Sequence, residues 1–281
     1  MKGSRPGSHR SPFCRDPAAR RMSLQVRDQA ILASVAEYGL LSLDGIRTLA
    51  SFGSRERAAV RTRLLFDHGY LDRRFVPTIR GSAKVLYVLG AAGVEIVAAR
   101  LGQDVAEVRR RRKAALEIRE AALPHCLQVA EIRRILSVAL AKTAATRLDR
   151  WVGSADLARI FRGRLFLPDG YFRYWHRDKL YACFLEVDLG TESHPRLLKK
   201  TSQYLRYGLT GAYRKDFGLR FFRVLLVAPT EARRAHLQTT IERTTDKMFW
   251  LAVISEVRPE TALGPIWTRP HRTGRFSLVE L

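Results

Sequence analysis

Three acidic residues in the middle of the chain have the types and spacing of a metal-dependent hydrolytic site. Pro168 and Asp169 open an apolar segment, and the next apolar segment carries Glu186 and Asp188. Residues two apart in a strand point to the same face, so Glu186 and Asp188 should lie side by side. Mg²⁺ prefers hard oxygen ligands, and carboxylates on neighbouring strands hold it where phosphodiesters are cleaved. The three carboxylates therefore predict a site for Mg²⁺ or Mn²⁺.

This layout is similar to the core of restriction-endonuclease-type nucleases, described by the pattern PD-(D/E)xK. In such sites a lysine two residues after the Glu steadies the developing charge, but here that position is Asp188. Asp188 is therefore an additional metal ligand candidate, and Lys199 or Lys200 on the next helix is the candidate replacement for the lysine. Because adjacent acids repel each other, we expect a metal, one of these lysines or an arginine beside them.

Further candidate residues flank the carboxylates. Gln203 and Tyr207 lie one helical turn apart on the helix expected over 194–208, where they would contact the DNA backbone or brace the carboxylates. His125 and Glu131, on the helix before the sheet, would complete a metal shell. The alternatives are a helix-start or packing role for His125 and a surface salt bridge for Glu131.

The charge of the chain favours a polyanionic partner. Its 50 Lys and Arg residues against 27 Asp and Glu residues give a net charge of +23. Binding of DNA phosphates is the commonest use of such a surface, and an anionic membrane surface is the rival. No apolar run is long enough to span a bilayer, and no basic helix has a clean apolar face with aromatic anchors.

The three cysteines, Cys14, Cys126 and Cys183, form no CxxC pair. Neither a zinc site nor a disulfide framework is indicated, so a reducing cytoplasm is the simplest compartment.

The first half of the chain has the element order of a winged helix-turn-helix. Helices are expected over 28–38, 42–50 and 55–68, followed by strands over 70–76 and 85–89. The third helix would enter the major groove and the hairpin would be the wing. The candidate DNA-binding residues are Arg55, Arg57, Arg61 and Arg63 on the helix and Arg73, Arg74, Arg80 and Lys84 on the wing. The alternative is a solvated basic helix in a protein–protein winged-helix domain.

The predicted class is α+β, with four segments. Residues 1–26 are a disordered basic tail, and 27–102 are the winged helix. Residues 103–122 are a linker helix whose cationic run, 109–113, is either solvated or touches DNA backbone. Residues 123–281 are the nuclease-like domain.

Within 123–281, a helix from Cys126 to about Thr146 should precede a mixed sheet flanked by helices. The C-terminal 25 residues, rich in Pro and Arg, are expected to wrap the surface. Strands are predicted over 165–167, 170–174, 181–188, 221–228 and 249–255, and helices over 194–208 and 231–245.

The chain resembles the replication-relaxation family of bacterial plasmids and integrative elements, from about Asp28 to Leu281. The resemblance rests on the segments 67–71, 124–127, 168–172, 184–192 and 263–267, of which the Glu-x-Asp-x-Gly-Thr-Glu in 184–192 is the most specific. It implies a DNA-binding protein of plasmid replication or conjugative mobilisation, and an Asp at the lysine position that is a family trait.

Three functions remain open from the sequence. The first is a DNA-binding accessory protein of a mobile element, with double-stranded DNA as partner and a relaxase, a replication initiator or a second copy as protein partner. The second is a metal-dependent nickase or nuclease. The third is a transcriptional repressor acting through the winged helix alone.

Overall fold

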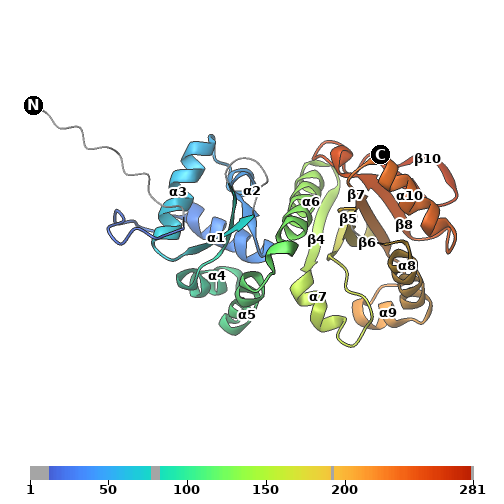
Figure 1. The fold of residues 1–281 in the computed structure, drawn as a ribbon, viewed down its shortest axis with the longest axis horizontal. Coiled ribbons are helices and arrows are strands. Elements are labelled where there is room, and N and C mark those ends of the chain that lie inside the picture. Colours follow the sequence, from blue (N-terminus) through green and yellow to red (C-terminus); the bar gives the residue numbers. More distant parts are fainter. Residues whose placement is uncertain (1–12, 77–82, 191–192, 280–281) are drawn as a thin grey trace, which may run out of the picture. The chain divides into compact units, whose positions relative to one another are not determined.

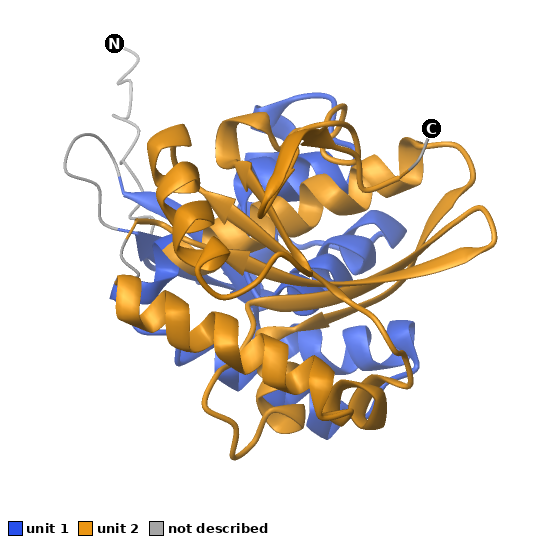
Figure 2. Ribbon diagram, turned by 90° about the vertical axis from the view of Figure 1, so that its right-hand side faces the viewer, with its two compact units in different colours: residues 1–124 blue, residues 125–281 orange. Residues whose placement is uncertain are grey.

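A computed structural model describes residues 13–76, 83–190 and 193–279 (Figure 1). The chain divides into two compact units, residues 1–124 and 125–281 (Figure 2). This division falls two residues after the boundary expected at 122/123. Arg80, Thr191 and Glu192 lie outside the described residues.

The first unit has the helix–helix–helix–hairpin order expected from the sequence. Its antiparallel sheet has the strand order β1-β3-β2, with β1 an addition to the expected hairpin. The elements are α1 (Val26–Tyr38), β1 (Leu41–Ser42), α2 (Leu43–Leu49), α3 (Arg55–Asp67), β2 (Leu71–Val76), β3 (Lys84–Leu89), η1 (Ala91–Gly93), α4 (Val94–Leu101), α5 (Val105–Leu116) and η2 (Glu120–Ala122).

Local signals explain where these helices begin and end. The Ser42 and Ser54 hydroxyls accept backbone N–H groups at the starts of α2 and α3, which satisfies donors that a helix start leaves unpaired. Gly39 ends α1 with φ of 77°, a conformation that favours glycine. Helix α3 buries residues 58, 62, 65 and 66 and leaves Val60 exposed.

The described part of the predicted tail, residues 13–25, contacts the first unit. Arg15 pairs with Asp72 and lies over the Phe66 ring, and the Phe13 and Phe75 rings are 4.2 Å apart. These contacts fasten the segment along α3 and β2, using apolar and ionic groups that composition alone does not reveal.

The predicted linker helix, α5, packs into the first unit. Val108 is buried in that unit's core, and Arg112 donates to the Leu89 carbonyl and pairs with Asp72. Cations of the run 109–113 also pair with Glu95, Glu107 and Glu117. The run is therefore partnered within its own unit.

The second unit is built on a seven-stranded mixed sheet with the order β10-β9-β8-β7-β6-β5-β4. The elements are α6 (Leu123–Lys142), β4 (Thr146–Gly153), α7 (Ser154–Ile160), β5 (Gly170–His176), β6 (Lys179–Val187), α8 (His194–Leu209), α9 (Ala212–Phe217), β7 (Arg223–Ala228), α10 (Glu231–Glu242), β8 (Phe249–Val253), η3 (Ile254–Glu256), β9 (Trp267–Arg269) and β10 (Arg272–Phe276).

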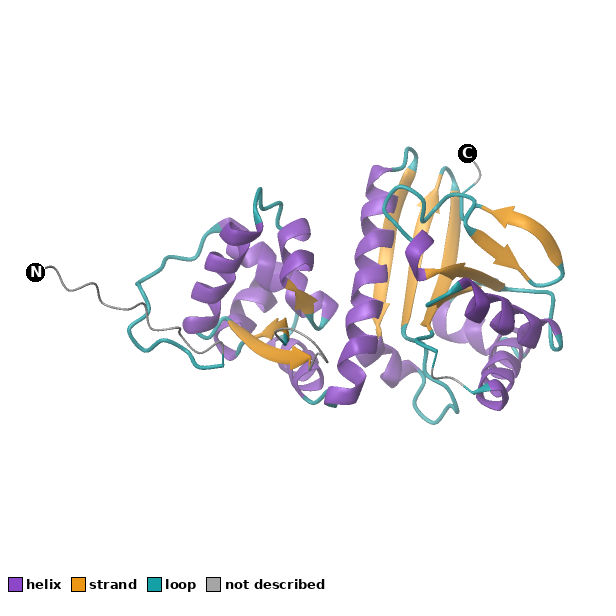
Figure 3. Cartoon of the chain, turned by 45° about the horizontal axis from the view of Figure 1, so that its top comes forward, coloured by secondary structure: helices purple, strands orange, loops and turns teal. Residues whose placement is uncertain are grey.

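Helices cover both faces of this sheet (Figure 3). Strands β4, β5 and β6 form an antiparallel meander, and β6, β7 and β8 run parallel through the crossover helices α8 and α10. Helix α6 packs on one face, and α7, α8, α9 and α10 pack on the other. The predicted class is confirmed: an α+β chain with a helical first unit and a mixed sheet in the second.

Several elements of the second unit differ from the prediction. Residues 165–167 are a loop, although a strand was expected. Strand β4 begins where the expected long helix was to end and was not predicted, because four of its eight residues are charged or polar and only Val152 is buried. The C-terminal segment does more than wrap the surface, since it adds β9 and β10 and buries Trp267 completely.

Candidate functional site

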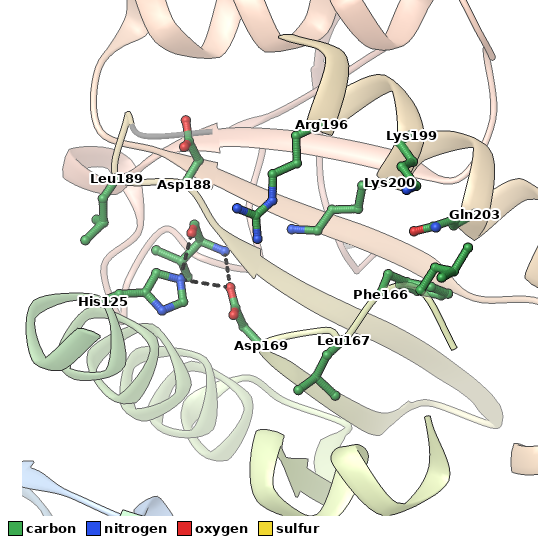
Figure 4. Close-up of a pocket in the computed structure, with 12 residues that line it drawn as sticks. His125, Phe166, Leu167, Asp169, Asp188, Leu189, Arg196, Lys199, Lys200 and Gln203 are labelled. Atoms are coloured by element: carbon green, nitrogen blue, oxygen red, sulfur yellow. Dashed lines mark hydrogen bonds and ion pairs between the residues drawn. The ribbon is translucent and has the colours of Figure 1, made fainter. Parts of the chain in front are cut away.

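A pocket of about 510 Å³ lies at the end of β6, between α8 and the start of α6 (Figure 4). Asp169 and His125 line one side, and cationic side chains of α8 line the other. The complete lining is His125, Leu165, Phe166, Leu167, Asp169, Val187, Asp188, Leu189, Arg196, Lys199, Lys200 and Gln203.

Asp169 is held against the end of β6 by its backbone and its side chain. Its N–H donates to the Leu185 carbonyl at 3.2 Å, and its Oδ2 accepts the Val187 N–H at 2.8 Å. His125 Nε2 lies 3.2 Å from the same Oδ2 and 3.0 Å from the Val187 carbonyl oxygen. The imidazole therefore bridges two oxygens at the pocket edge.

The protonated form of His125 is favoured in this arrangement. Its hydrogen bond to Asp169 is the largest of the effects that raise its pKa to about 10, against the opposing effect of burial. The role of His125 as a metal ligand stays a prediction.

We expect His125→Gln to lower the free energy of unfolding at pH 6 by about 1 kcal/mol. The effect is this small because the ring is partly exposed and solvent screens its ion pair with Asp169. The folded-state pKa is raised, so the stabilisation is complete below the unfolded value near 6.5 and is lost as pH rises through about 10. Urea unfolding of both proteins at pH 6 and pH 10 measures this. A deficit that does not shrink at pH 10 would contradict it.

Glu186 is buried on the α8 face of β6. Its Oε2 accepts the Lys200 ammonium at 2.8 Å, and its Oε1 accepts the Tyr204 hydroxyl at 2.5 Å. Burial raises the pKa of Glu186 to about 7, Lys200 opposes the rise, and the Asp169 charge adds to it. Lys200 thus reaches the carboxylate as the sequence suggested, while its catalytic role stays a prediction.

Tyr204 was not among the predicted residues. It lies four residues after Lys200, and this spacing alone places both side chains on one face of α8.

Asp188 lies just past β6 and is also buried. Its Oδ2 accepts the Arg233 Nε at 2.5 Å, and its Oδ1 accepts the Gly190 N–H at 3.0 Å. Glu186 and Asp188 share the predicted face, but Glu186 meets α8 and Asp188 meets α10. Arg233 is the arginine that the sequence allowed beside these acids. The Asp188 carboxylate points away from Asp169 (Figure 4).

The remaining predicted residues divide between pocket and scaffold. Gln203 lines the pocket. Tyr207 is buried and donates to Asp216 at 2.7 Å, so it does not brace the acidic residues of the pocket. Glu131 is outside the lining and pairs with Arg134 at 2.7 Å, which matches the salt-bridge alternative.

The donor set fits a three-carboxylate metal centre poorly. Among the residues that the structure describes, no group of three or more His, Cys, Asp and Glu side chains could hold a metal ion. The charge of Asp169 raises the pKa of Glu186.

Four of the predicted DNA-binding arginines take part in the internal contacts of the first unit. Arg61 pairs with buried Asp28, and Arg63 pairs with Asp67. Arg74 donates to carbonyls at the end of α5. Arg73 lies over the Phe66 and Tyr87 rings, where burial lowers its pKa.

The other three predicted cations, Arg55, Arg57 and Lys84, are exposed. Arg55 makes a 3.4 Å contact with exposed Asp44.

Comparison with known proteins identifies the family. The sequence pattern described as replication-relaxation matches residues 32–220. The chain belongs to the replication-relaxation family. The match covers both the helix–hairpin segment of the first unit and the carboxylates, Lys200 and Tyr204 of the second. No curated protein matches the chain.

The structure is also similar to two solved structures of the restriction endonuclease FokI. One matches at 13% identity and a TM-score of 0.28, covering 82% of this chain and 42% of that one. The other, FokI bound to DNA, matches at 12% identity and a TM-score of 0.27, covering 82% and 43%. The chain spans less than half the length of these proteins. None of the helices in the described part of the chain is long and apolar enough to cross a membrane.

Proposed function

We propose that this replication-relaxation protein binds double-stranded DNA without cutting it. Its role would be that of a cytoplasmic accessory factor in the replication or conjugative mobilisation of a bacterial plasmid or integrative element. A relaxase, a replication initiator or a second copy of the chain would be its protein partner. Family membership and the net charge of +23 support this role.

The observation that carries the proposal is the pairing of each site carboxylate with a cation of the chain itself. Asp169 has His125, Glu186 has Lys200, and Asp188 has Arg233. A nuclease site leaves such carboxylates for a metal ion, which offsets their repulsion of DNA.

Here protein cations offset that repulsion, and α8 adds Arg196 and Lys199 to the pocket lining. The pocket is therefore suited to a phosphate group.

A supercoiled-plasmid assay with Mn²⁺ tests this proposal. Wild type and Asp169→Ala should both retard the plasmid and neither should nick it, and retardation should persist in EDTA. Asp169→Asn is the matched control, because its amide oxygen can still accept the Val187 N–H. Nicking by wild type that disappears in both variants would overturn the proposal.

A second function, metal-dependent nicking, has one observation in its favour. Lys200 lies 2.8 Å from Glu186, so α8 delivers a lysine to the site although Asp188 occupies the expected position. Mg²⁺ held by Asp169 and Glu186 would polarise a phosphate and activate water. Lys200 would then steady the developing charge. On this alternative Lys200→Met abolishes nicking and leaves plasmid retardation in EDTA within a few fold of wild type.

A further inference from the structure

A second hollow of about 370 Å³ adjoins the pocket in the same unit. Leu165, Phe166 and Gln203 line both. The rest of the second lining is Gly163, Arg164, Arg206, Tyr207, Thr210 and Ala212. The two hollows lie between α8 and the loop of residues 163–169, and together we call them the α8 groove.

One face of α8 forms a wall along the whole groove. Starting at Arg196, its lining residues recur every three or four positions, which places them on one side of a helix. The face ends at Thr210, so this wall is about 21 Å long at 1.5 Å per residue. The residues are Arg196, Lys199, Lys200, Gln203, Arg206, Tyr207 and Thr210.

The chemistry of the groove changes along its length. Arg196, Lys199 and Lys200 gather at one end, opposite Asp169 (Figure 4). Where the two hollows meet, Leu165 is 78% exposed beside Phe166, whose ring packs edge-on against Tyr204 at 4.8 Å. An isolated exposed leucine is ordinary. Leu165, however, lines a hollow together with an aromatic ring and the exposed Arg206, so it offers an apolar contact close to a positive charge.

We propose that the α8 groove binds single-stranded DNA. A phosphate would lie at the cationic end, and the adjoining base would rest against Leu165 and Phe166, with Arg206 beside it. Bases stack on apolar and aromatic side chains whatever their sequence, and arginine adds to that contact. A base in a duplex has both faces covered by its neighbours, so only an unpaired base can enter the hollow. This inference rests on the proposed DNA binding. The cationic end would contact phosphates of either form of DNA, and only an unpaired base would add the apolar contact.

Two labelled probes test the proposal in EDTA by fluorescence anisotropy. One is oligothymidine of about twelve nucleotides, within the usual site size of single-strand binders. The other is an oligomer of equal length made of abasic sites. Full-length wild type should bind oligothymidine about fivefold or more tightly than the abasic oligomer. Lys199→Ala should weaken both probes to a similar degree.

Leu165→Ser should remove the preference for oligothymidine and leave abasic binding unchanged. Leu209→Ser is the matched control, since Leu209 is 85% exposed at the end of α8 but lines neither hollow. The proposal is overturned if the two probes bind equally, or if the two leucine variants behave alike. It is also overturned if Leu165→Ser changes only the sedimentation coefficient, which would assign the apolar contact to a second copy of the chain.

A duplex of the same length separates this inference from the proposed function. Duplex binding without a preference between the two single-stranded probes would refute the groove assignment alone. If the wild type bound neither the duplex nor the single-stranded probes, both the groove assignment and the proposed DNA binding would be refuted.

Discussion

Raising the salt concentration from 50 to 200 mM should weaken duplex binding by this protein about 10³-fold. Protein cations that neutralise DNA phosphates release the counterions condensed on the DNA. The logarithm of the binding constant therefore falls linearly with the logarithm of salt concentration. The exposed cations at the expected contact surfaces are Arg55, Arg57 and Lys84 in the first unit and Arg196, Lys199 and Arg206 in the second. About six phosphate contacts correspond to a slope of about −5. Anisotropy of a labelled duplex in EDTA across a KCl series measures this slope.

Single substitutions separate contact residues from the general charge of the chain. Arg57→Gln or Lys199→Gln should each reduce the slope by about one, because each removes one phosphate contact. Lys247→Gln is the control, since Lys247 is exposed but lies outside the expected contact surfaces. A slope near zero would contradict electrostatic binding. A reduction by Lys247→Gln equal to the other two would mean that overall charge, not these positions, determines affinity.

The elements predicted best from the sequence are those set by local signals. Ser42 and Ser54 cap their helices and Gly39 ends α1, all within one helical turn of the element that they define. Strand β4 has no such signal, because it is an edge strand with only Val152 fully buried. Its identity depends on pairing with β5, which lies in a later segment of the chain.

The carboxylates of the candidate site were also readable from the sequence, but most of their partners were not. Glu186 and Asp188 share a face because strand geometry requires it. Once Lys200 is placed beside Glu186, helical spacing places Tyr204 on the same face of α8. Arg233 reaches the site from α10 through tertiary structure. His125 was predicted near the site as a metal ligand, but its pairing with Asp169 also depends on tertiary structure. Arg61 and Arg74 also find acceptors far away in sequence, so their contacts within the first unit were not predicted.

Wild type should lose about 3 kcal/mol of unfolding free energy between pH 4.5 and pH 7.5 that Glu186→Gln does not lose. The folded protein holds the Glu186 proton up to a pKa of about 7, whereas the unfolded chain releases it near the ordinary value of 4.5. In this window the folded state binds more protons, so stability falls as pH rises. The difference of about 2.5 pKa units corresponds to about 3 kcal/mol.

Urea unfolding at several pH values measures the effect as the difference between wild type and variant, in which contributions common to both proteins cancel. The glutamine amide of the variant would resemble the protonated carboxyl, so contacts with Lys200 and Tyr204 can persist. Glu231→Gln is an informative control, because the hydrogen bond from Arg234 lowers the pKa of Glu231. The stabilisation by ionised Glu231 is present at neutral pH and lost on acidification. The stability difference between wild type and Glu231→Gln should therefore grow as pH rises, opposite to that for Glu186→Gln. Parallel curves for wild type and Glu186→Gln would mean that Lys200 fully offsets burial, leaving Glu186 ionised as readily as a solvated carboxylate.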